Sequence, residues 1–209
     1  MFRDDWLIDG PGETPVTLVL AHGAGAPMDS PFMNVIAEGV ARSGFRVVRF
    51  EFPYMARRRT EGVKGPPNRE PVLLDAWREV FAAVRTTGPT VIGGKSLGGR
   101  MASKIADEVG AAGLVCLGYP FHPPGKPERL RTEHLRDLQT PTLIVQGTRD
   151  PFGTESEVGA YQLSPEIRVF WSGDGDHSLK PRVRSGRTEP QNLSEAVEEI
   201  CGFMRELRV

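Results

Sequence analysis

The chain has 209 residues, and its 26 basic and 27 acidic side chains leave a formal net charge of −1. This length accommodates one α/β domain with a sizeable core, and the balanced charge does not favour nucleic acid or a membrane surface as a partner. No apolar stretch is long enough to cross a bilayer, and the N-terminal segment lacks the apolar centre of a signal peptide. We therefore expect a single domain over residues 1–209, located in the cytoplasm.

Cysteine usage agrees with that compartment. Cys116 and Cys201 fall in an apolar strand-like run and in a late helical segment, so we expect small core residues of a reduced protein. No metal-ligand cluster and no dinucleotide fingerprint is present, so no metal and no cofactor is expected.

Short apolar runs alternate with segments of helical periodicity along the whole chain. Strands are expected within residues 2–9 (at an edge) and at 16–21, 45–52, 90–92, 113–117, 142–146 and 167–171. Helices are expected at 30–43, 72–85, 100–109, 128–138, 155–163 and 193–207, and a long irregular loop at 53–71. This alternation predicts an α/β fold with a mostly parallel central sheet and helices on both faces. Functional residues should then lie at the carboxyl ends of the strands.

Residues 94–98 read Gly-Lys-Ser-Leu-Gly, a match to G-x-S-x-G between the strand at 90–92 and the helix at 100–109. This is the context of a nucleophile elbow, where Ser96 occupies a strained turn and glycines allow strand and helix to pass closely. The pentapeptide alone is weak support, because a glycine-rich turn with Ser96 as a helix N-cap would look the same.

The same residues resemble the end of a phosphate-binding loop, G-x-x-x-x-G-K-[ST]. Pro89 stands where that motif requires its first glycine. The nearest glycine, Gly88, precedes the strand, so the intervening residues cannot curl around a phosphate. The sequence therefore argues against a nucleotide-binding loop.

Ser96, Asp150 and His177 occur in this order, each just past an apolar strand. A serine hydroxyl needs a base to become a nucleophile, imidazole is the usual base near neutral pH, and a buried carboxylate fixes its tautomer. Ser, Asp, His is the order of the α/β-hydrolase triad. We therefore predict Ser96 as nucleophile, His177 as base and Asp150 as its orienting carboxylate.

Each assignment has an alternative. His177 could be a surface histidine, and Asp150 could simply cap the following turn without a catalytic role. Asp174 or Asp176 could replace Asp150, although their closeness to His177 in sequence makes that geometry hard to form. His134 lies in a polar segment and is expected to be solvated.

A tetrahedral intermediate needs two N–H donors for its oxyanion. The residue after the nucleophile supplies one, which is the backbone N–H of Leu97. Residues 22–25, His-Gly-Ala-Gly, follow the strand at 16–21, and their small side chains favour the Ala24 N–H as the second donor. His22 is expected to hold this loop by a hydrogen bond.

With these motifs the chain resembles the α/β-hydrolases, in particular the dienelactone-hydrolase-like group. More narrowly it resembles small bacterial predicted hydrolases, which are similar to a testis-expressed hydrolase-like protein and to a subunit of the NSL chromatin complex. The segments that carry the resemblance are 22–27, 52–54, 94–99, 118–126, 147–150 and 176–177. Dienelactone hydrolases use cysteine as nucleophile, whereas this chain has Ser96 at that position.

The segment 118–138, where many α/β-hydrolases insert a cap domain, is too short for one. We expect a shallow pocket roofed by residues 53–71 and 119–126. The candidate lining residues are His22, Tyr54, Lys95, Tyr119 and His122.

Basic residues gather in loops expected near the same face: Lys95, Arg57–Arg59, Lys126, Lys180, Arg182 and Arg184. They could form a rim that attracts anionic acyl substrates. The alternative, which we favour, is ordinary solvated loop charge balanced by acids elsewhere.

These observations predict a serine hydrolase that cleaves a small carboxylic ester or thioester through an acyl-enzyme. Some relatives look like scaffold proteins, so one alternative is an interaction module with a vestigial triad. Another is cofactor-free haloperoxidase-type chemistry on the same residues. The sequence gives neither the acyl group nor the oligomeric state.

Overall fold

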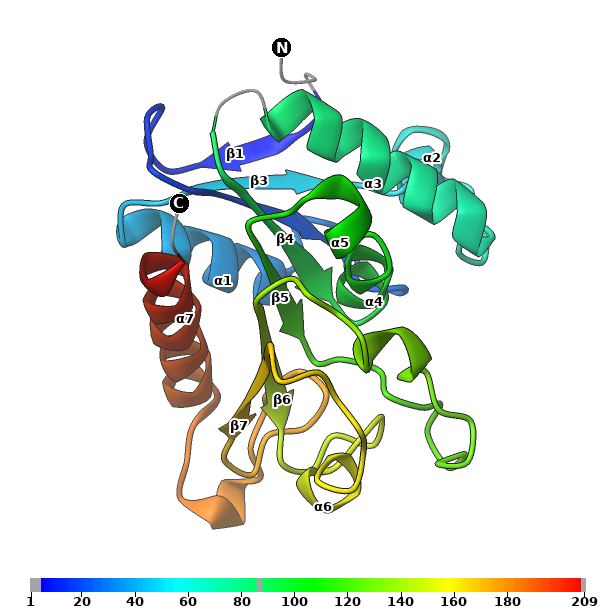
Figure 1. Ribbon diagram of the computed structural model, residues 1–209, viewed down its shortest axis with the longest axis vertical. Coiled ribbons are helices and arrows are strands. Elements are labelled where there is room, and N and C mark those ends of the chain that lie inside the picture. Colours follow the sequence, from blue (N-terminus) through cyan, green and yellow to red (C-terminus); the bar gives the residue numbers. More distant parts are fainter. Residues whose placement is uncertain (1–4, 86–87, 208–209) are drawn as a thin grey trace.

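The computed structural model describes residues 5–85 and 88–207. Its centre is a seven-stranded sheet in the order β1-β3-β2-β4-β5-β6-β7 (Figure 1). The strands are β1 (Leu7–Asp9), β2 (Thr17–Ala21), β3 (Arg46–Phe50), β4 (Thr90–Lys95), β5 (Gly113–Leu117), β6 (Thr142–Gly147) and β7 (Ile167–Ser172). Only the edge strand β1 is antiparallel to its neighbour among these described strands. The predicted mostly parallel sheet and its edge strand are therefore confirmed.

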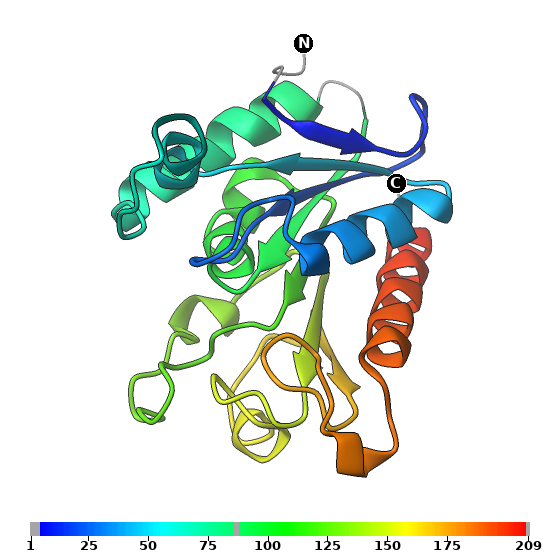
Figure 2. The same cartoon turned by 180° about the vertical axis from the view of Figure 1, so that it is seen from behind.

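Helices cover both faces of the sheet (Figures 1 and 2). They are α1 (Pro31–Arg42), α2 (Pro53–Glu61), α3 (Glu70–Val84), α4 (Leu97–Ser103), α5 (Ala106–Val109), α6 (Glu155–Val158) and α7 (Glu189–Glu206). Two short 3₁₀ turns are η2 (Glu133–Leu135) and η3 (Val183–Ser185). In the described part of the chain no helix has both the length and the apolar character needed to cross a membrane.

The apolar strands supply two cores at once. In β2, Val19 and Ala21 join the core under α3 and α4, whereas Leu18 and Leu20 join the core under α1 and α7. Successive side chains of a strand point to opposite faces, so a strand buried on both sides must be apolar throughout. This explains why the strands were visible in the sequence as continuous apolar runs.

The predicted loop at 53–71 is wrong, because it contains α2 and the start of α3. Pro53 stands in the first turn of α2, where its fixed φ suits the helix, and Gly62 ends the helix with a φ of 70°. Only Tyr54 and Met55 of α2 are buried. Two adjacent buried residues give no helical periodicity, and the rest of the helix is rich in arginine. The sequence pattern therefore does not predict a helix here.

Other boundaries also differ from the prediction. Helix α4 starts at Leu97, directly after Ser96, and the expected helix at 100–109 breaks before α5. The expected helix at 128–138 reduces to η2, because the Arg131 N–H is bonded to the Phe121 carbonyl at 2.8 Å. The expected helix at 155–163 ends after one turn. In contrast, α7 begins earlier than expected, where the Thr188 side chain accepts the Gln191 N–H.

One contact fixes how closely α1 and α7 approach. Gly39 of α1 is buried, and a Cβ atom built on it would lie 2.7 Å from Cγ2 of Val197 in α7. Real Cβ atoms do not come so close to a branched side chain in a packed core.

We predict that Gly39→Val lowers the free energy of unfolding by about 2 kcal/mol, because it overpacks this crossing. Gly202→Val in α7 is the matched control, since a Cβ at Gly202 meets nothing within 4 Å. The control should change stability by less than about 0.5 kcal/mol. Urea denaturation measures both values, and equal effects of the two substitutions would contradict the close approach of α1 and α7.

Candidate active site

Ser96 occupies a strained turn between β4 and α4. Its φ is 50° and its ψ is −110°, a conformation that costs a residue with a side chain about 1–3 kcal/mol. A Cβ at Gly94 would lie 2.2 Å from the Ala21 carbonyl oxygen, and one at Gly98 would lie 2.4 Å from it. Both glycines of the motif are therefore required because the end of β2 passes directly beside the turn.

Ser96, His177 and Asp150 form a hydrogen-bonded chain. His177 Nε2 lies 3.0 Å from Ser96 Oγ, and its Nδ1 lies 2.8 Å from Asp150 Oδ2. With the proton on Nδ1, His177 donates to Asp150 and can accept from the Ser96 hydroxyl. The turns after β6 and β7 bring Asp150 and His177 to the carboxyl edge of the sheet, beside Ser96.

Asp174 and Asp176, the two alternatives to Asp150, are engaged in other contacts. Asp174 pairs with Arg149 and Arg182. Asp176 Oδ1 accepts the N–H groups of Ser178 and Lys180 at 2.8 and 3.0 Å. Asp150 is thus the carboxylate that holds His177.

Asp150 is fully buried and has further partners. Its Oδ1 accepts the Phe152 N–H at 2.9 Å, so it also caps the turn, as the alternative interpretation proposed. Its Oδ2 accepts from Gln146 Nε2 at 2.9 Å. The Phe152 ring centroid lies 4.2 Å from that of His177 and covers the imidazole. Buried polar groups need such hydrogen-bond partners, which here hold the Asp150 side chain in one position.

Gln146 and Phe152 were not among the residues predicted from the sequence. Gln146 is fully buried and its Oε1 accepts the Tyr119 N–H at 2.7 Å, which ties the loop after β5 to β6. A signal was available, because Gln146 is a polar residue near the end of an otherwise apolar strand. Phe152 gave no comparable signal.

His22 holds the loop after β2, as predicted. It is fully buried, its Nε2 accepts the Phe52 N–H at 3.1 Å, and its Nδ1 lies 2.6 Å from the Gly23 carbonyl. Because Nε2 is the acceptor, Nδ1 carries the proton and the ring is neutral. Burial lowers the pKa of His22 and so favours this neutral form.

Tyr54 holds the same loop from α2. Its hydroxyl lies 3.0 Å from the Ala24 carbonyl oxygen and 3.3 Å from that of Gly23, and burial raises its pKa to about 12. In a trans peptide the N–H points opposite to the C=O. Anchoring the Gly23 carbonyl to His22 and Tyr54 therefore turns the Ala24 N–H away from both side chains.

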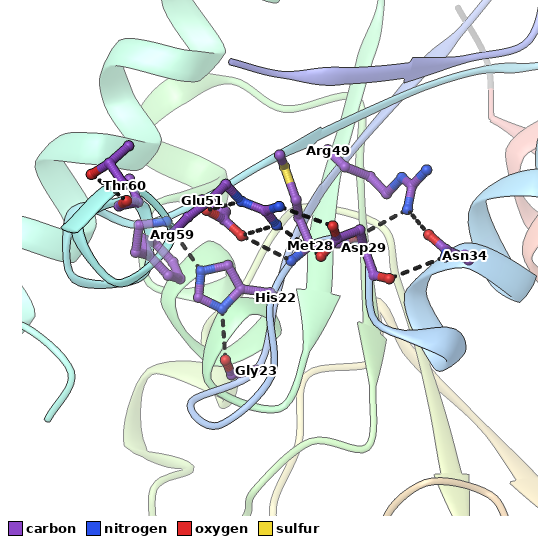
Figure 3. A network of polar contacts seen from close by, with 11 residues as sticks. His22, Gly23, Met28, Asp29, Asn34, Arg49, Glu51, Arg59 and Thr60 are labelled. Carbon is purple, nitrogen blue, oxygen red and sulfur yellow. Dashed lines mark hydrogen bonds and ion pairs between the residues drawn. The ribbon is translucent and has the colours of Figure 1, made fainter. Parts of the chain in front are cut away.

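A network of ion pairs and hydrogen bonds holds the end of this loop that leads into α1 (Figure 3). Arg59 of α2 contacts Asp29 and Glu51, each at 2.8 Å. Arg49 donates to the Met28 carbonyl at 2.9 Å. The loop between β2 and α1 is thus held at both ends before any ligand binds.

A cavity of about 390 Å³ lies over Ser96 and His177. Residues 23–26, the segment 30–33, Lys95, Phe152 and Ser178 form the rest of its wall. Leu97 is the first residue of α4, so its N–H has no acceptor within that helix. A larger hollow, of about 570 Å³, lies at the amino ends of the strands around Gly88 and Thr90, away from these groups.

Of the five predicted pocket residues, Lys95 lines this cavity. His22 and Tyr54 lie beneath its loop wall. Tyr119 is fully buried with its hydroxyl on the Arg131 carbonyl at 3.0 Å, and His122 is buried with Nδ1 on the Pro123 carbonyl at 2.9 Å. The expected roof of residues 53–71 and 119–126 is therefore wrong: α2 packs below the loop, and Gln146 draws the Tyr119 segment into the core.

His134 is half-buried and hydrogen-bonded, whereas a solvated side chain was expected. Its Nε2 lies 2.9 Å from Ser103 Oγ and 3.4 Å from the Tyr119 hydroxyl. Burial, together with nearby Lys104 and Arg100, lowers its pKa to about 4. His134 does not line the cavity, and its role is to satisfy polar groups beneath α4.

No group of three or more His, Cys, Asp or Glu side chains among residues 5–85 and 88–207 is placed to hold a metal ion.

Known proteins resemble this chain in sequence and in fold. Residues 14–205 match the sequence profile of a family described as "Alpha/beta hydrolase domain". The chain is 24% identical over 161 residues to "Putative protein-lysine deacylase ABHD14B" of Pongo abelii, which covers 77% of this chain and 74% of that protein.

Two solved structures share the fold. A serine hydrolase without lid from Xanthomonas campestris has a TM-score of 0.72 and 21% identity, over 98% of this chain and 89% of that one. A dienelactone hydrolase from Anabaena variabilis has a TM-score of 0.70 and 21% identity, over 97% and 92% of the two chains. The predicted fold class, without a large cap domain, and the dienelactone-hydrolase-like resemblance are confirmed.

The His134 environment predicts how stability depends on pH. Its pKa is 6.5 in the unfolded reference and about 4 in the fold, so the unfolded chain takes up a proton first as the pH falls. Stability should therefore decrease as the pH is lowered from 6.5 towards 4, and His22 adds to this decrease.

We expect His134→Asn to cost about 1 kcal/mol at pH 7, through its lost hydrogen bonds, and to lose less stability on acidification than the wild type. Urea denaturation at a series of pH values from 7 down to 4 measures this. Parallel curves for the two proteins would contradict the neutral, half-buried state of His134.

Proposed function

The chain belongs to the alpha/beta hydrolase domain family, and from that premise we propose that it is a serine hydrolase of small carboxylic esters or thioesters. The observation that carries this proposal is the hydrogen-bonded chain Ser96–His177–Asp150 at the strained turn after β4. The chemistry uses an acyl-enzyme intermediate.

In the first half of the reaction, His177 Nε2 takes the proton of Ser96 Oγ as that oxygen attacks the substrate carbonyl carbon. The Leu97 and Ala24 N–H groups donate to the oxyanion that forms. When the intermediate collapses, the departing alcohol or thiol takes the proton from His177, and the acyl group stays on Ser96. Water then repeats the sequence and releases the acid.

Asp150 stabilises the imidazolium that exists while His177 carries both protons. Its burial and its bonds from Gln146 and Phe152 keep it in one position, so this stabilisation needs no rearrangement during the reaction. His22 and Tyr54 act as positioning residues, since they fix the peptide that presents the Ala24 N–H.

The cavity supports the choice of a small acyl group. Its volume of about 390 Å³ is at the lower end of the range of ligand sites, and most of its wall is apolar. A reducing compartment such as the cytoplasm would preserve the free thiols of Cys116 and Cys201.

The relative named as a lysine deacylase suggests a further leaving group for the same chemistry. An acylated lysine side chain is an amide, and it would be cleaved by the same attack of Ser96 with the amine as leaving group. An acyl-lysine peptide therefore belongs in the substrate screen beside esters and thioesters.

We predict that the purified protein hydrolyses para-nitrophenyl butyrate and that Ser96→Ala and His177→Ala lower kcat by about 10⁴-fold or more. Ser194→Ala, on the exposed face of α7, is the matched serine control and should retain wild-type rates. Circular dichroism verifies folding of each variant.

Turnover that persists in folded Ser96→Ala would refute the assignment of the nucleophile. Failure of folded wild type to cleave any ester, thioester or acyl-lysine would favour an interaction module on the hydrolase fold.

A further inference from the structure

Lys95 is the residue immediately before Ser96, and its side chain lines the same cavity. Its ammonium group has three N–H donors. Among the described residues, the His177 carbonyl accepts one of them, and the Phe32 ring lies beneath the group with its centroid 5.5 Å from Nζ. The contacts of Lys95 therefore leave donor capacity beside the reacting serine.

The ammonium has no carboxylate partner within ion-pair distance in the described parts of the chain. Asp150 is committed to His177 and Gln146, and Asp176 accepts backbone N–H groups of its own loop. Burial lowers the pKa of Lys95 to about 8, and the charges of Asp150 and Asp176 oppose this only from beyond ion-pair distance. A buried cation without a direct ion pair is stabilised when an opposite charge comes close. An anion entering the cavity would meet this need.

The rest of the cavity wall indicates which kind of anion would bind. Apart from Lys95 and His177, the wall carries no ionisable side chain. Small residues, Phe32, Met33 and Phe152 form an apolar surface that suits a short methylene chain. In such surroundings a charge-assisted hydrogen bond is stronger than it is in water.

Three of the other basic residues considered for a rim are paired with acids. Arg59 is bound to Asp29 and Glu51, Arg57 to Glu61, and Arg182 to Asp174. Of all the residues considered for the rim, Lys95 is the one that lines the cavity.

We propose that Lys95 binds a carboxylate on the acyl part of the substrate, so that the preferred substrates are esters or thioesters of short dicarboxylic acids. The inference rests on the proposed function of Ser96 and adds the substrate class. The acyl carbonyl lies at Ser96, the methylene chain lies against Phe32, and the far carboxylate reaches Nζ of Lys95.

Binding tests this without turnover. In a Ser96→Ala background, isothermal titration calorimetry compares monomethyl glutarate, which carries a carboxylate, with dimethyl glutarate, which is neutral. We expect the monoester to bind more tightly than the diester. Adding Lys95→Met should weaken the monoester by about 10- to 100-fold and leave the diester nearly unaffected, whereas Lys95→Arg should retain the preference.

Lys126→Met is the matched control, because Lys126 is an exposed lysine outside the cavity. It should leave the binding of both compounds unchanged. Equal binding of the two glutarates, or an equal loss of both with Lys95→Met, would overturn the proposal and leave Lys95 as a support for the His177 carbonyl.

Kinetics give the second readout, as the ratio of kcat/KM for mono-para-nitrophenyl glutarate to that for para-nitrophenyl valerate. The acyl chains have the same length, so the ratio cancels any loss that both esters share. Lys95→Met should lower the ratio by about 10- to 100-fold, and an unchanged ratio contradicts the proposal. If wild type cleaves neither ester, the proposed function fails, and the calorimetry still decides whether Lys95 binds carboxylates.

Discussion

The backbone of Ser96 has a φ of 50°, and the arrangement of the site depends on holding this strained turn against the end of β2. The register of the parallel strands sets Ala21 opposite Gly94, so the Ala21 carbonyl passes within reach of a Cβ at either glycine of the motif. The same register brings the ends of β6 and β7 to that edge. The fold tolerates the strain at Ser96 because a buried apolar core on each face of the sheet stabilises it.

Around this turn, hydrogen bonds between buried polar groups fix the position of each catalytic residue. Gln146 and the Phe152 N–H fix Asp150, Asp150 fixes the tautomer of His177, and His22 with Tyr54 fixes the peptide before Ala24. Each bond removes a freedom that would otherwise have to be lost at the transition state. The proposed mechanism is thus a consequence of hydrogen bonds that also hold the loops together.

The sequence revealed what is locally encoded. Apolar strands buried on both faces, the glycines beside Ser96, and the order of Ser96, Asp150 and His177 were all visible. Helix α2 was hidden, because a helix that buries little besides Tyr54 and Met55 has no apolar period to detect. Tyr119 was misplaced because its position depends on Gln146, a partner far away in the chain, and such tertiary hydrogen bonds leave no local pattern.

The central claim is that Ser96 is a nucleophile activated by His177. Labelling with a fluorophosphonate, followed by mass spectrometry of the modified peptide, tests it without knowledge of the substrate. We predict one adduct, on Ser96 in wild type, that disappears in folded Ser96→Ala and in folded His177→Ala. An adduct on another residue, equal labelling of His177→Ala, or no labelling of folded wild type would contradict it.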